Sequence, residues 1–520
     1  MVARPDGDGE GGPRGEGQGR NPSMHEHGKS DGPVVPAKPP NKPARAGAEV
    51  VEGRGPAEGN TAGKTRSGRS AGNSVPSALD RVREVAQKDR DAKFTALLHH
   101  VDVERLRAAY RAIRPGAAPG ADGVTWHAYG QDPEANLRGL HARVVRGAYR
   151  ASPSKRAFIP KADGGLRPLG IAALEDKILQ RAVAEVLNAV YEVDFPGFSY
   201  GFRAGRSPHR ALDALAFGIC RKRVNWVLDA DIRGYFDAID HGWLMRFVEH
   251  RIADQRVLRL IEKWLRAGVI EDGVWTASEE GTPQGAPVSV LLANVYLHYV
   301  FDLWAHQWRG RHAHGDVVIV RYADDIVVGF EHRDDAERFR ADLRERFAQF
   351  ALELHADKTR LIEFGRFAAP NRRRRGDRKP ETFDFLGFTH ICAKTKNGRF
   401  KLKRVTIKKR LAAKLRSVRV ELMRRRHEPI PDQGRWLASV IAGHVNYYGV
   451  PDNGRAIATF RWQAVWLWRR ALRRRSHKAR GLTWERMDRL VKRWLPPARI
   501  VHPWPEQRFA ATTQGRSPVR

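Results

Sequence analysis

The amino-acid sequence predicts an α+β fold whose strands pair as antiparallel hairpins and which ends in an all-helical region. Three observations carry this prediction. Short apolar runs meet at tight turns, as in DVVIVRYADDIVVGF (Asp316–Phe330). Longer segments between such runs repeat apolar residues with the period of a helix. From about Val405 onward the pattern is helical throughout and crowded with arginine.

Composition limits the classes of protein to be considered. The chain has 520 residues and a formal net charge of +34, which favours a polyanionic partner and nucleic acid first. Its two cysteines, Cys220 and Cys392, form neither a disulfide framework nor a CxxC metal site. No apolar stretch approaches the length of a membrane span, so we expect an intracellular protein with no membrane contact.

The elements are expected in the following order. Residues 1–78 are dominated by Gly, Pro, Ala, Ser and charges, and we expect them to be disordered because they bury too little apolar surface. Helical patterning follows in LDRVREVAQ, VERLRAAYRAI and ANLRGLHARVVRGAYRA, and AFIPKADGGLRPLGI predicts two strands around a DGG turn. DKILQRAVAEVLNAVYEV predicts a helix, VNWVLDADI a strand and VLLANVYLHYVFDLWAHQW one long helix. Asn397-Gly398 predicts a last hairpin.

Two groups of carboxylates interrupt the apolar strands. Asp324 and Asp325 are adjacent, and burying both is costly because neighbouring like charges resist joint ionisation. Asp229 and Asp231 would face the same side of their strand. If the strands are neighbours, three of these carboxylates suit a pair of Mg²⁺ ions that promote an in-line phosphoryl displacement. The alternative is a solvated turn, in which Asp is common.

The residues of several sequence blocks, and the order of these blocks, resemble a known family. PKADGGLRPLGI, SYGFRAGRSPHRAL, LDADIRGYFDAIDH, GTPQGAPVSVLLANVYLH, RYADD, LHADKTR and FDFLGF follow the order of group II intron-encoded reverse transcriptases, also called maturases. GHVNYYGVPDN and LTWERMDRL resemble the thumb, or X, domain of that family. The resemblance implies a right-hand polymerase with fingers and an antiparallel palm sheet at 79–400, an all-α thumb at 401–505 and a short basic tail at 506–520.

The resemblance also assigns the catalytic residues. Asp231, Asp324 and Asp325 match the family's metal-binding aspartates, with two Mg²⁺ ions as cofactor, and Asp229 stays open as an alternative to Asp231. Phe236, five residues after Asp231, matches an aromatic residue beside the sugar of the incoming nucleotide, where its ring leaves no room for a ribose hydroxyl.

Further residues are assigned to the nucleotide pocket. Lys161 and Arg167 match residues of the fingers that hold the triphosphate, and Gln284 matches a residue lining the pocket. The sequence departs from the family in SVLLAN, where Val290 replaces a frequent proline, and we expect only local backbone consequences. Lys358 lies near the primer by analogy, or else on the surface.

Asp237 and Asp240 are expected to cap the helix that follows them. In RWQAVWLWRRALRRRSHKAR (Arg461–Arg480), aromatic and basic residues interleave on one predicted helix. Trp462 and Trp466 are one turn apart, and we expect both to face the core. An outer basic face would contact RNA phosphates through Arg469, Arg470, Arg473, Arg474, Arg475 and Lys478.

The resemblance implies an RNA-directed DNA polymerase that binds its group II intron RNA, assists its splicing and copies it into DNA during retrohoming. The expected partners are the intron RNA, the DNA target with its primer, and dNTPs. We expect a bacterial cytoplasmic protein that associates with the nucleoid during insertion. Two alternatives stay open: a splicing-only RNA-binding maturase, and a domesticated reverse transcriptase that serves defence or CRISPR adaptation.

Many members of the family carry an HNH nuclease module after the thumb. Here EQRFAATTQGRSPVR follows the last thumb-like residues, and it contains no His or Cys. A tail this short cannot form a folded nuclease, so we expect no HNH module and no cutting of the second DNA strand. The primer would then come from elsewhere, such as a nascent strand at a replication fork.

Overall fold

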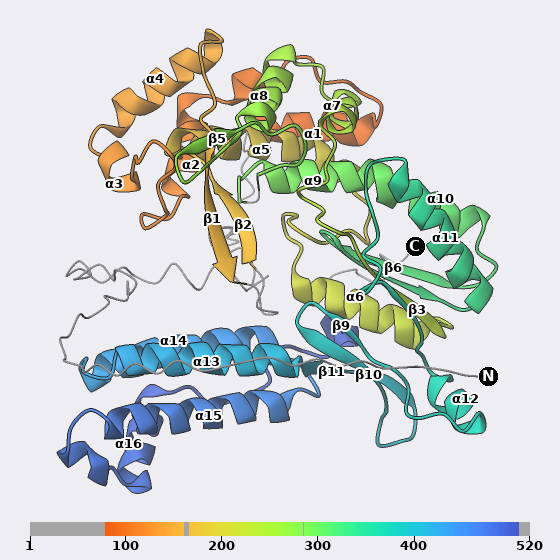
Figure 1. Ribbon diagram of the computed structural model, residues 1–520. Coiled ribbons are helices and arrows are strands. Elements are labelled where there is room, and N and C mark those ends of the chain that lie inside the picture. The colour runs from red at the N-terminus through yellow and green to blue at the C-terminus, as the bar shows by residue number, and fades with distance from the viewer. Residues whose placement is uncertain (1–77, 161–165, 284, 509–520) are drawn as a thin grey trace, which may run out of the picture. The chain divides into compact units, whose positions relative to one another are not determined.

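The computed structural model describes residues 78–160, 166–283 and 285–508. The low-complexity segment before Ala78 and the DGG turn therefore lie outside the described residues. Within them, the expected mixture of helices and antiparallel strands is confirmed, and the strands form three sheets (Figure 1). No helix in these ranges is both long and apolar enough to cross a lipid bilayer.

The sheet that carries the carboxylates has four antiparallel strands in the order β6-β7-β3-β8. These strands are β3 (Trp226–Asp231), β6 (Val317–Tyr322), β7 (Asp325–Phe330) and β8 (Arg360–Glu363). Successive side chains feed two different cores: Val227 and Val327 face one, whereas Leu228 and Val328 face the other. Both faces are therefore covered, which explains why the strands are apolar almost throughout.

Helices cover the two faces of this sheet. α6 (Pro208–Arg221) lies on the face shared with Val318, where a Cβ at Gly218 would come within 2.5 Å of the valine side chain. On the opposite face lies α11 (Arg333–Ala348), whose Phe339 contacts Phe330 of β7 with ring centroids 5.3 Å apart.

The helix expected after the GTPQGAP block is interrupted by a wider turn. α9 (Ser289–Leu297) continues into a π-helical turn, η3 (His298–Asp302), and then into α10 (Leu303–Arg311). Such turns carry one extra residue and are frequent near functional sites.

The remaining elements are a second sheet and a group of helices. The helices supply much of the core that contains Leu228 and Val328, which we call the first core. A second sheet has the order β2-β1-β4-β5, and its β1–β2 pairing confirms the expected strands around the undescribed turn. Its strands are β1 (Ser154–Pro160), β2 (Leu166–Ile171), β4 (Val269–Glu271) and β5 (Val274–Thr276). The accompanying helices are α1 (Ala78–Lys88), η2 (Leu98–His100), α2 (Val103–Arg111), α3 (Trp126–Tyr129), α4 (Pro133–Val145), α5 (Leu174–Asp194), α7 (His241–Glu249) and α8 (Gln255–Arg266).

The third sheet, in the order β11-β10-β9, leads into the helical region. The Asn397-Gly398 hairpin is confirmed, with Gly398 at φ +76°. Its elements are α12 (Ala368–Arg374), β9 (Phe383–Phe385), β10 (Phe388–Lys394) and β11 (Phe400–Thr406). The expected domain boundary at 400/401 falls inside β11, and the domain divisions stay predictions.

The C-terminal helices form a core of their own. They are α13 (Lys408–Arg424), α14 (Ile430–Tyr448), α15 (Gly454–Arg473), η4 (Lys478–Gly481) and α16 (Trp484–Trp494). The GHVNYYGVPDN block joins this core to the third sheet. Asn453 donates to the Thr406 hydroxyl over 2.8 Å and accepts from the Thr406 amide over 3.0 Å, and the Tyr447 hydroxyl donates to the Leu386 carbonyl over 2.9 Å.

Candidate active site

Strand pairing brings the predicted aspartates to one end of the central sheet. Tyr322 and Asp325 face each other across the β6–β7 hairpin, which leaves Ala323 and Asp324 as its two-residue turn. On its other side, Asp325 lies directly opposite Asp231 at the end of β3. The expected adjacency of the two carboxylate-bearing strands is thus confirmed.

The LHADKTR segment lies around Asp231. The His355 amide donates to the Asp231 carbonyl over 2.8 Å, and Thr359 Oγ1 accepts from the Asp231 amide over 3.4 Å. The Lys358 ammonium lies 3.2 Å from Asp231 Oδ2. Lys358 is exposed, yet it is also the cationic partner of a predicted catalytic carboxylate.

Asp229 has a different environment from Asp231. Burial raises the pKa of Asp229 to about 7, and the nearby charge of Asp231 adds to this effect, while Arg360 opposes it. The Arg360 guanidinium lies 3.7 Å from Asp229 Oδ2, on the neighbouring strand β8. Asp229 therefore lies beside the Arg360 guanidinium, whereas Asp231 lies beside the Lys358 ammonium and opposite Asp325 in the strand register.

The donor chemistry at this end of the sheet suits Mg²⁺, because carboxylate oxygens are its preferred protein ligands. As the side chains stand, however, no three His, Cys, Asp or Glu residues among those described are gathered closely enough to hold a metal ion. The strands bring Asp231, Asp324 and Asp325 together at the level of the backbone, and rotation of the side chains would be needed to complete a metal site.

The block that contains Gln284 lies beside Phe236. Thr282 donates its amide to the Phe236 carbonyl over 2.8 Å, and a Cβ at Gly281 would come within 2.9 Å of the same oxygen. Gly281 has φ +79°, so both space and backbone conformation favour glycine there. Phe236 itself is half-buried at the edge of the first core.

The structure places only part of the predicted nucleotide pocket. Lys161 and Gln284 lie outside the described residues. Arg167 is exposed on β2, where it pairs with Ile159. Of the two expected helix caps, Asp240 accepts from the Trp243 amide over 2.7 Å at the start of α7, whereas Asp237 caps no helix, because α7 begins after Asp240.

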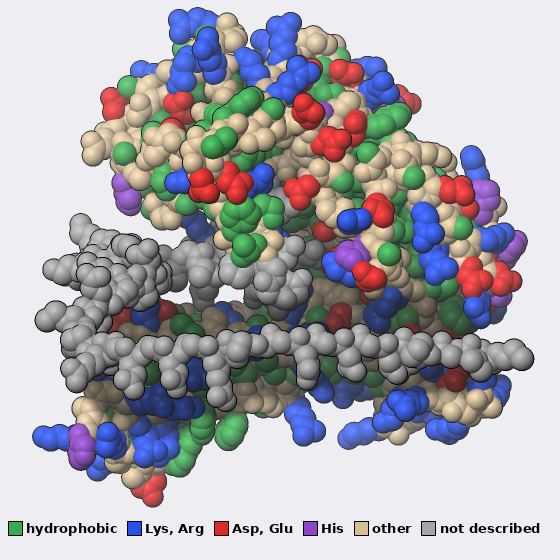
Figure 2. Space-filling view, viewed as in Figure 1, with side chains coloured by type: hydrophobic (Ala, Val, Ile, Leu, Met, Phe, Trp, Pro, Cys, Tyr) green, Lys and Arg blue, Asp and Glu red, His purple; other side chains and the backbone are tan. Residues whose placement is uncertain are grey.

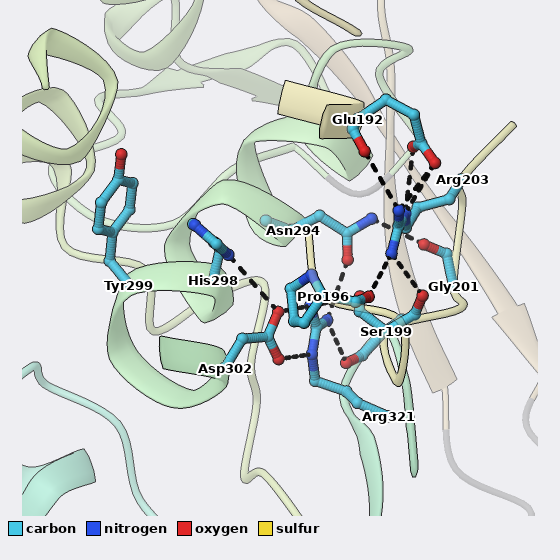
Figure 3. Close-up of polar contacts among 12 residues, drawn as sticks. Glu192, Pro196, Ser199, Gly201, Arg203, Asn294, His298, Tyr299, Asp302 and Arg321 are labelled. Atoms are coloured by element: carbon cyan, nitrogen blue, oxygen red, sulfur yellow. Dashed lines mark hydrogen bonds and ion pairs between the residues drawn. The ribbon is translucent and has the colours of Figure 1, made fainter. Parts of the chain in front are cut away.

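One set of residues near the turn is not identified by the sequence analysis. Arg321, which directly precedes Tyr322, is wholly buried and pairs with Asp302 of the π-helical turn (Figure 3). It also contacts Asn294 and Ser199. The available signal is a single charge in the strand VVIVRY, since a buried arginine is rare unless it is paired.

The basic residues of the C-terminal region surround a cavity of about 640 Å³ on α15 and η4. The lining residues are Trp466, Arg469, Arg470, Arg473, Arg474 and Arg480. We call this surface the arginine groove. In the space-filling view, basic side chains gather where α16 and the end of α15 lie (Figure 2). Two of the predicted RNA-binding residues lie outside the lining: Arg475 donates to the His427 carbonyl over 3.3 Å, and Lys478 is exposed on η4.

The expectation that Trp462 and Trp466 face the core is wrong. The two residues are 62% and 41% exposed. The buried face of α15 instead repeats through Phe460, Ala464 and Trp468, and residues two positions away on a helix point to the other side. A spacing of one turn places the two tryptophans on the same face of the helix, but it does not show whether that face is buried.

Comparison with known proteins adds to this geometry. Residues 159–390 match the family described as reverse transcriptase (RNA-dependent DNA polymerase). The chain is 34% identical to protein YkfC of Escherichia coli over 274 residues, which cover 47% of this chain and 72% of YkfC. It is also 34% identical to the group II intron-encoded protein LtrA of Lactococcus lactis, over 42% of this chain and 37% of LtrA. A third relative, nuclear intron maturase 3 of Arabidopsis thaliana, is 31% identical over 24% of this chain and 17% of its own length.

Proposed function

The chain belongs to the family of group II intron-encoded reverse transcriptases and maturases, and from this we propose that it binds its own intron RNA, assists the splicing of that RNA and copies it into DNA during retrohoming. The polymerase activity is that of the family, an RNA-directed DNA polymerase. The single observation that carries the proposal is the pairing of Asp231 with Asp325, beside the turn that presents Asp324.

In this proposal the three structural regions take the roles of a right-hand polymerase. The sheet β6-β7-β3-β8 is the palm, the β1–β2 hairpin belongs to the fingers, and α13 to α16 form the thumb. The separate hydrophobic core of the C-terminal helices supports a thumb that packs as a unit. The Asn453–Thr406 hydrogen bonds would fix that unit to the strand that precedes it.

Reverse transcriptase domains use divalent metal ions, and we assign their binding here to Asp231, Asp324 and Asp325, with two Mg²⁺ ions. When bound, such ions activate the primer 3′-hydroxyl and stabilise the charge that develops on the transferred phosphoryl group. The chain's own task is to bring the three carboxylates together. Lys358, 3.2 Å from Asp231 Oδ2, offsets their mutual repulsion and would have to release that oxygen for a metal.

The remaining roles concern the substrates. Phe236 would lie against the sugar of the incoming nucleotide, and Lys161, Arg167 and Gln284 would contact the rest of it. The arginine groove would bind RNA phosphates, because its lining contains several guanidinium groups and no carboxylate. DNA target, primer and dNTPs are the other partners of this proposal.

Replacement of both turn aspartates tests the proposal. Asp324→Asn/Asp325→Asn should abolish primer extension, while the affinity for intron RNA and protein-assisted splicing stay within about twofold of wild type, because the arginine groove is on a separate core. Primer extension and splicing are measured on the same preparation. Equal loss of both activities would contradict the separation of roles, and a wild-type protein that splices without extending a primer would instead identify a splicing-only maturase.

A further inference from the structure

A buried arginine holds the turn that presents the proposed metal ligands. The side chain of Arg321 is fully buried, and so is that of its partner Asp302. Arg321 Nε donates to Asp302 Oδ1 over 2.7 Å and its Nη2 donates to Asp302 Oδ2 over 2.5 Å. The two contacts form the parallel, two-point geometry that only a guanidinium offers a carboxylate.

The other N–H groups of Arg321 reach three different segments of the chain. Nη1 donates to Asn294 Oδ1 over 3.0 Å and to the Ala323 carbonyl over 3.1 Å, while Nη2 donates to Ser199 Oγ over 2.7 Å. A guanidinium has five N–H donors, and these contacts supply five oxygen acceptors. The residue therefore has no hydrogen-bonding capacity left over.

The contact with Ala323 is the one that matters for the site. Ala323 is the first residue of the hairpin turn, directly before Asp324, and it has a positive φ of +55°. For a residue with a Cβ this conformation costs on the order of 1 kcal/mol or more, so it persists only where its surroundings impose it. Its carbonyl is held by Arg321 from within the sheet.

A glycine of the SYGFR segment lies directly against the same turn. A Cβ at Gly201 would lie 2.2 Å from the Ala323 amide nitrogen, so no other residue fits without moving the turn. The Gly201 carbonyl in turn accepts from Asn294 Nδ2 over 2.8 Å. Asn294 thus bridges Gly201 and Arg321 (Figure 3), and each of these two residues lies against Ala323.

A second buried arginine orders the segment that reaches Arg321. Arg203 Nη1 donates to the carbonyls of Pro196 and Ser199, over 2.7 Å each, and its Nη2 lies 2.8 Å from Glu192 at the end of α5. These contacts fix the loop between α5 and α6 at the point where Ser199 meets Arg321. The network therefore runs from Glu192 of α5, which is 27% exposed, through buried residues to the π-helical turn (Figure 3).

Stability alone is a poor explanation for such a pair. Taking two charges out of water costs much of what their attraction returns, and an apolar pair of similar volume is often as stable or more so. What an apolar pair cannot do is hold the Ala323 carbonyl and Asn294 at defined distances. The geometry points to a role in placing the turn.

We propose that Arg321 is a positioning residue for nucleotidyl transfer: its buried contacts with Asp302 and Asn294 set the conformation of Ala323, and through it the direction of the Asp324 and Asp325 carboxylates. The inference rests on the polymerase activity of the family and on the assignment of those carboxylates as metal ligands. Arg321 itself touches no substrate in this proposal.

The test separates placement from stability. The variant Arg321→Met/Asp302→Leu replaces the ion pair by apolar side chains, and Gly201→Ala displaces the turn by direct contact with Ala323 without touching a charge. Each variant is measured for thermal unfolding, for the rate and dNTP dependence of single-nucleotide incorporation, for the Mg²⁺ concentration at half-maximal rate, and for amide hydrogen exchange in the segment 319–327.

The double variant should unfold close to wild type but incorporate nucleotide about 100-fold more slowly, a typical effect of misplacing reacting groups by about 1 Å. It should also need more Mg²⁺ and exchange faster at the turn, with a smaller change in the dNTP dependence. Gly201→Ala should show the same pattern. Arg321→Lys should not restore the rate, because an ammonium cannot make the five contacts.

Two controls match these changes. Arg251→Met/Asp194→Leu removes another buried ion pair, which is held over 3.0 Å and contacts no residue of the turn. Gly139→Ala adds a methyl group where nothing lies within 4 Å. Both should keep their incorporation rate. Normal incorporation and an unchanged Mg²⁺ requirement in Arg321→Met/Asp302→Leu would overturn the inference. By contrast, an Asp324→Asn/Asp325→Asn protein that still polymerises would show that the metal assignment, and not the network, is wrong.

Discussion

Backbone contacts hold Phe236, the residue proposed to exclude ribonucleotides, in its place. Its carbonyl is held by the Thr282 amide, and Gly281 lies against it with no room for a side chain. The ring is nevertheless only half-buried, so its outer face is free to meet a ligand. An aromatic ring in a fixed place can exclude a hydroxyl group that a mobile side chain would admit.

We therefore predict that Phe236→Ala raises the incorporation of ribonucleotides relative to deoxyribonucleotides by roughly tenfold or more, because a hydroxyl group then meets open space. Phe236→Tyr keeps the bulk of the ring and should keep the preference for dNTPs. The ratio of incorporation efficiencies for matched rNTP and dNTP pairs measures the effect. An unchanged ratio in the alanine variant would mean that Phe236 only packs against the first core.

A single sequence identifies some of the residues at this site but not their partners. Asp231, Asp324 and Asp325 stand out because they break apolar strands, and their strands do pair as expected. Arg321 stands out for the same reason, but its partners do not. Asn294 and Asp302 lie on the continuous helical stretch of α9 and η3, Ser199 lies in the loop before α6, and no pattern within β6 points to either segment.

At the scale of single elements, α15 has a buried face and an exposed face. Sequence patterning alone assigns Trp462 and Trp466 to the wrong one. Its buried face holds Trp468, whose indole N–H donates to Gln433 Oε1 over 3.1 Å. Its outer face carries Trp462 and Trp466, of which Trp466 lines the arginine groove, with the Arg470 guanidinium 5.5 Å from its ring centroid. Exposed aromatic rings beside guanidinium groups are typical of surfaces that stack unpaired bases and bind the adjoining phosphates.

These two kinds of side chain should affect RNA binding in different ways. Trp462→Ala/Trp466→Ala should weaken binding of single-stranded or bulged RNA by about 1–3 kcal/mol for each stacked base, with little change in salt dependence. Arg473→Gln/Arg474→Gln should instead lower the slope of affinity against salt by about 0.7 for each lost phosphate contact. Salt titrations of binding to one RNA measure both effects.

The matched controls are Arg81→Gln/Arg259→Gln, two exposed arginines outside the groove, and thermal unfolding of the tryptophan variant. Because both tryptophans are exposed, their replacement should leave the unfolding temperature almost unchanged. If wild type and the Arg473/Arg474 variant had equal salt slopes, these arginines would not contact phosphates and would only make the surface soluble.

At the scale of the whole molecule, buried histidines occur in each of the three cores. His298 lies at the π-helical turn, His209 on α6, His390 on β10 and His444 on α14. Burial lowers the pKa of His298 to about 4 and that of the other three to about 3. Each is therefore neutral in the folded protein under ordinary conditions.

The sign of the resulting pH dependence follows from linkage. In the unfolded chain a histidine is protonated below about pH 6.5. In the folded protein the same histidine is protonated only below about pH 3 to 4. Stability is thus complete above pH 6.5 and falls as the pH drops toward the folded pKa values. Below pH 6.5, each such histidine lowers the free energy of unfolding by about 1.4 kcal/mol per pH unit, or by about 2 kcal/mol at pH 5.

His444 offers a direct test, because its ring stacks on Phe460 at 3.7 Å and its Nε2 has no hydrogen-bond partner. His444→Phe should narrow the difference in unfolding free energy between pH 8 and pH 5 by about 2 kcal/mol. Urea unfolding at both pH values provides the measurement, with the exposed His127→Phe as control. A variant as acid-sensitive as wild type would show that His444 is protonated in the folded state.

Local sequence determined the positions of the β1–β2 hairpin, β3, the β6–β7 hairpin with its carboxylate-bearing turn and the Asn397-Gly398 hairpin, because short apolar runs and turn chemistry depend on neighbouring residues alone; β4, β5 and β8 were not predicted. It also determined that α15 would be amphipathic. Only the tertiary structure decided that Asp231 lies opposite Asp325, that Trp462 and Trp466 face outward, and that Arg321 meets Asp302 and Asn294 behind the turn. The physical reason is that burial and ion pairing depend on which distant segments pack together, and a pattern within one segment carries no record of the surface that will cover it.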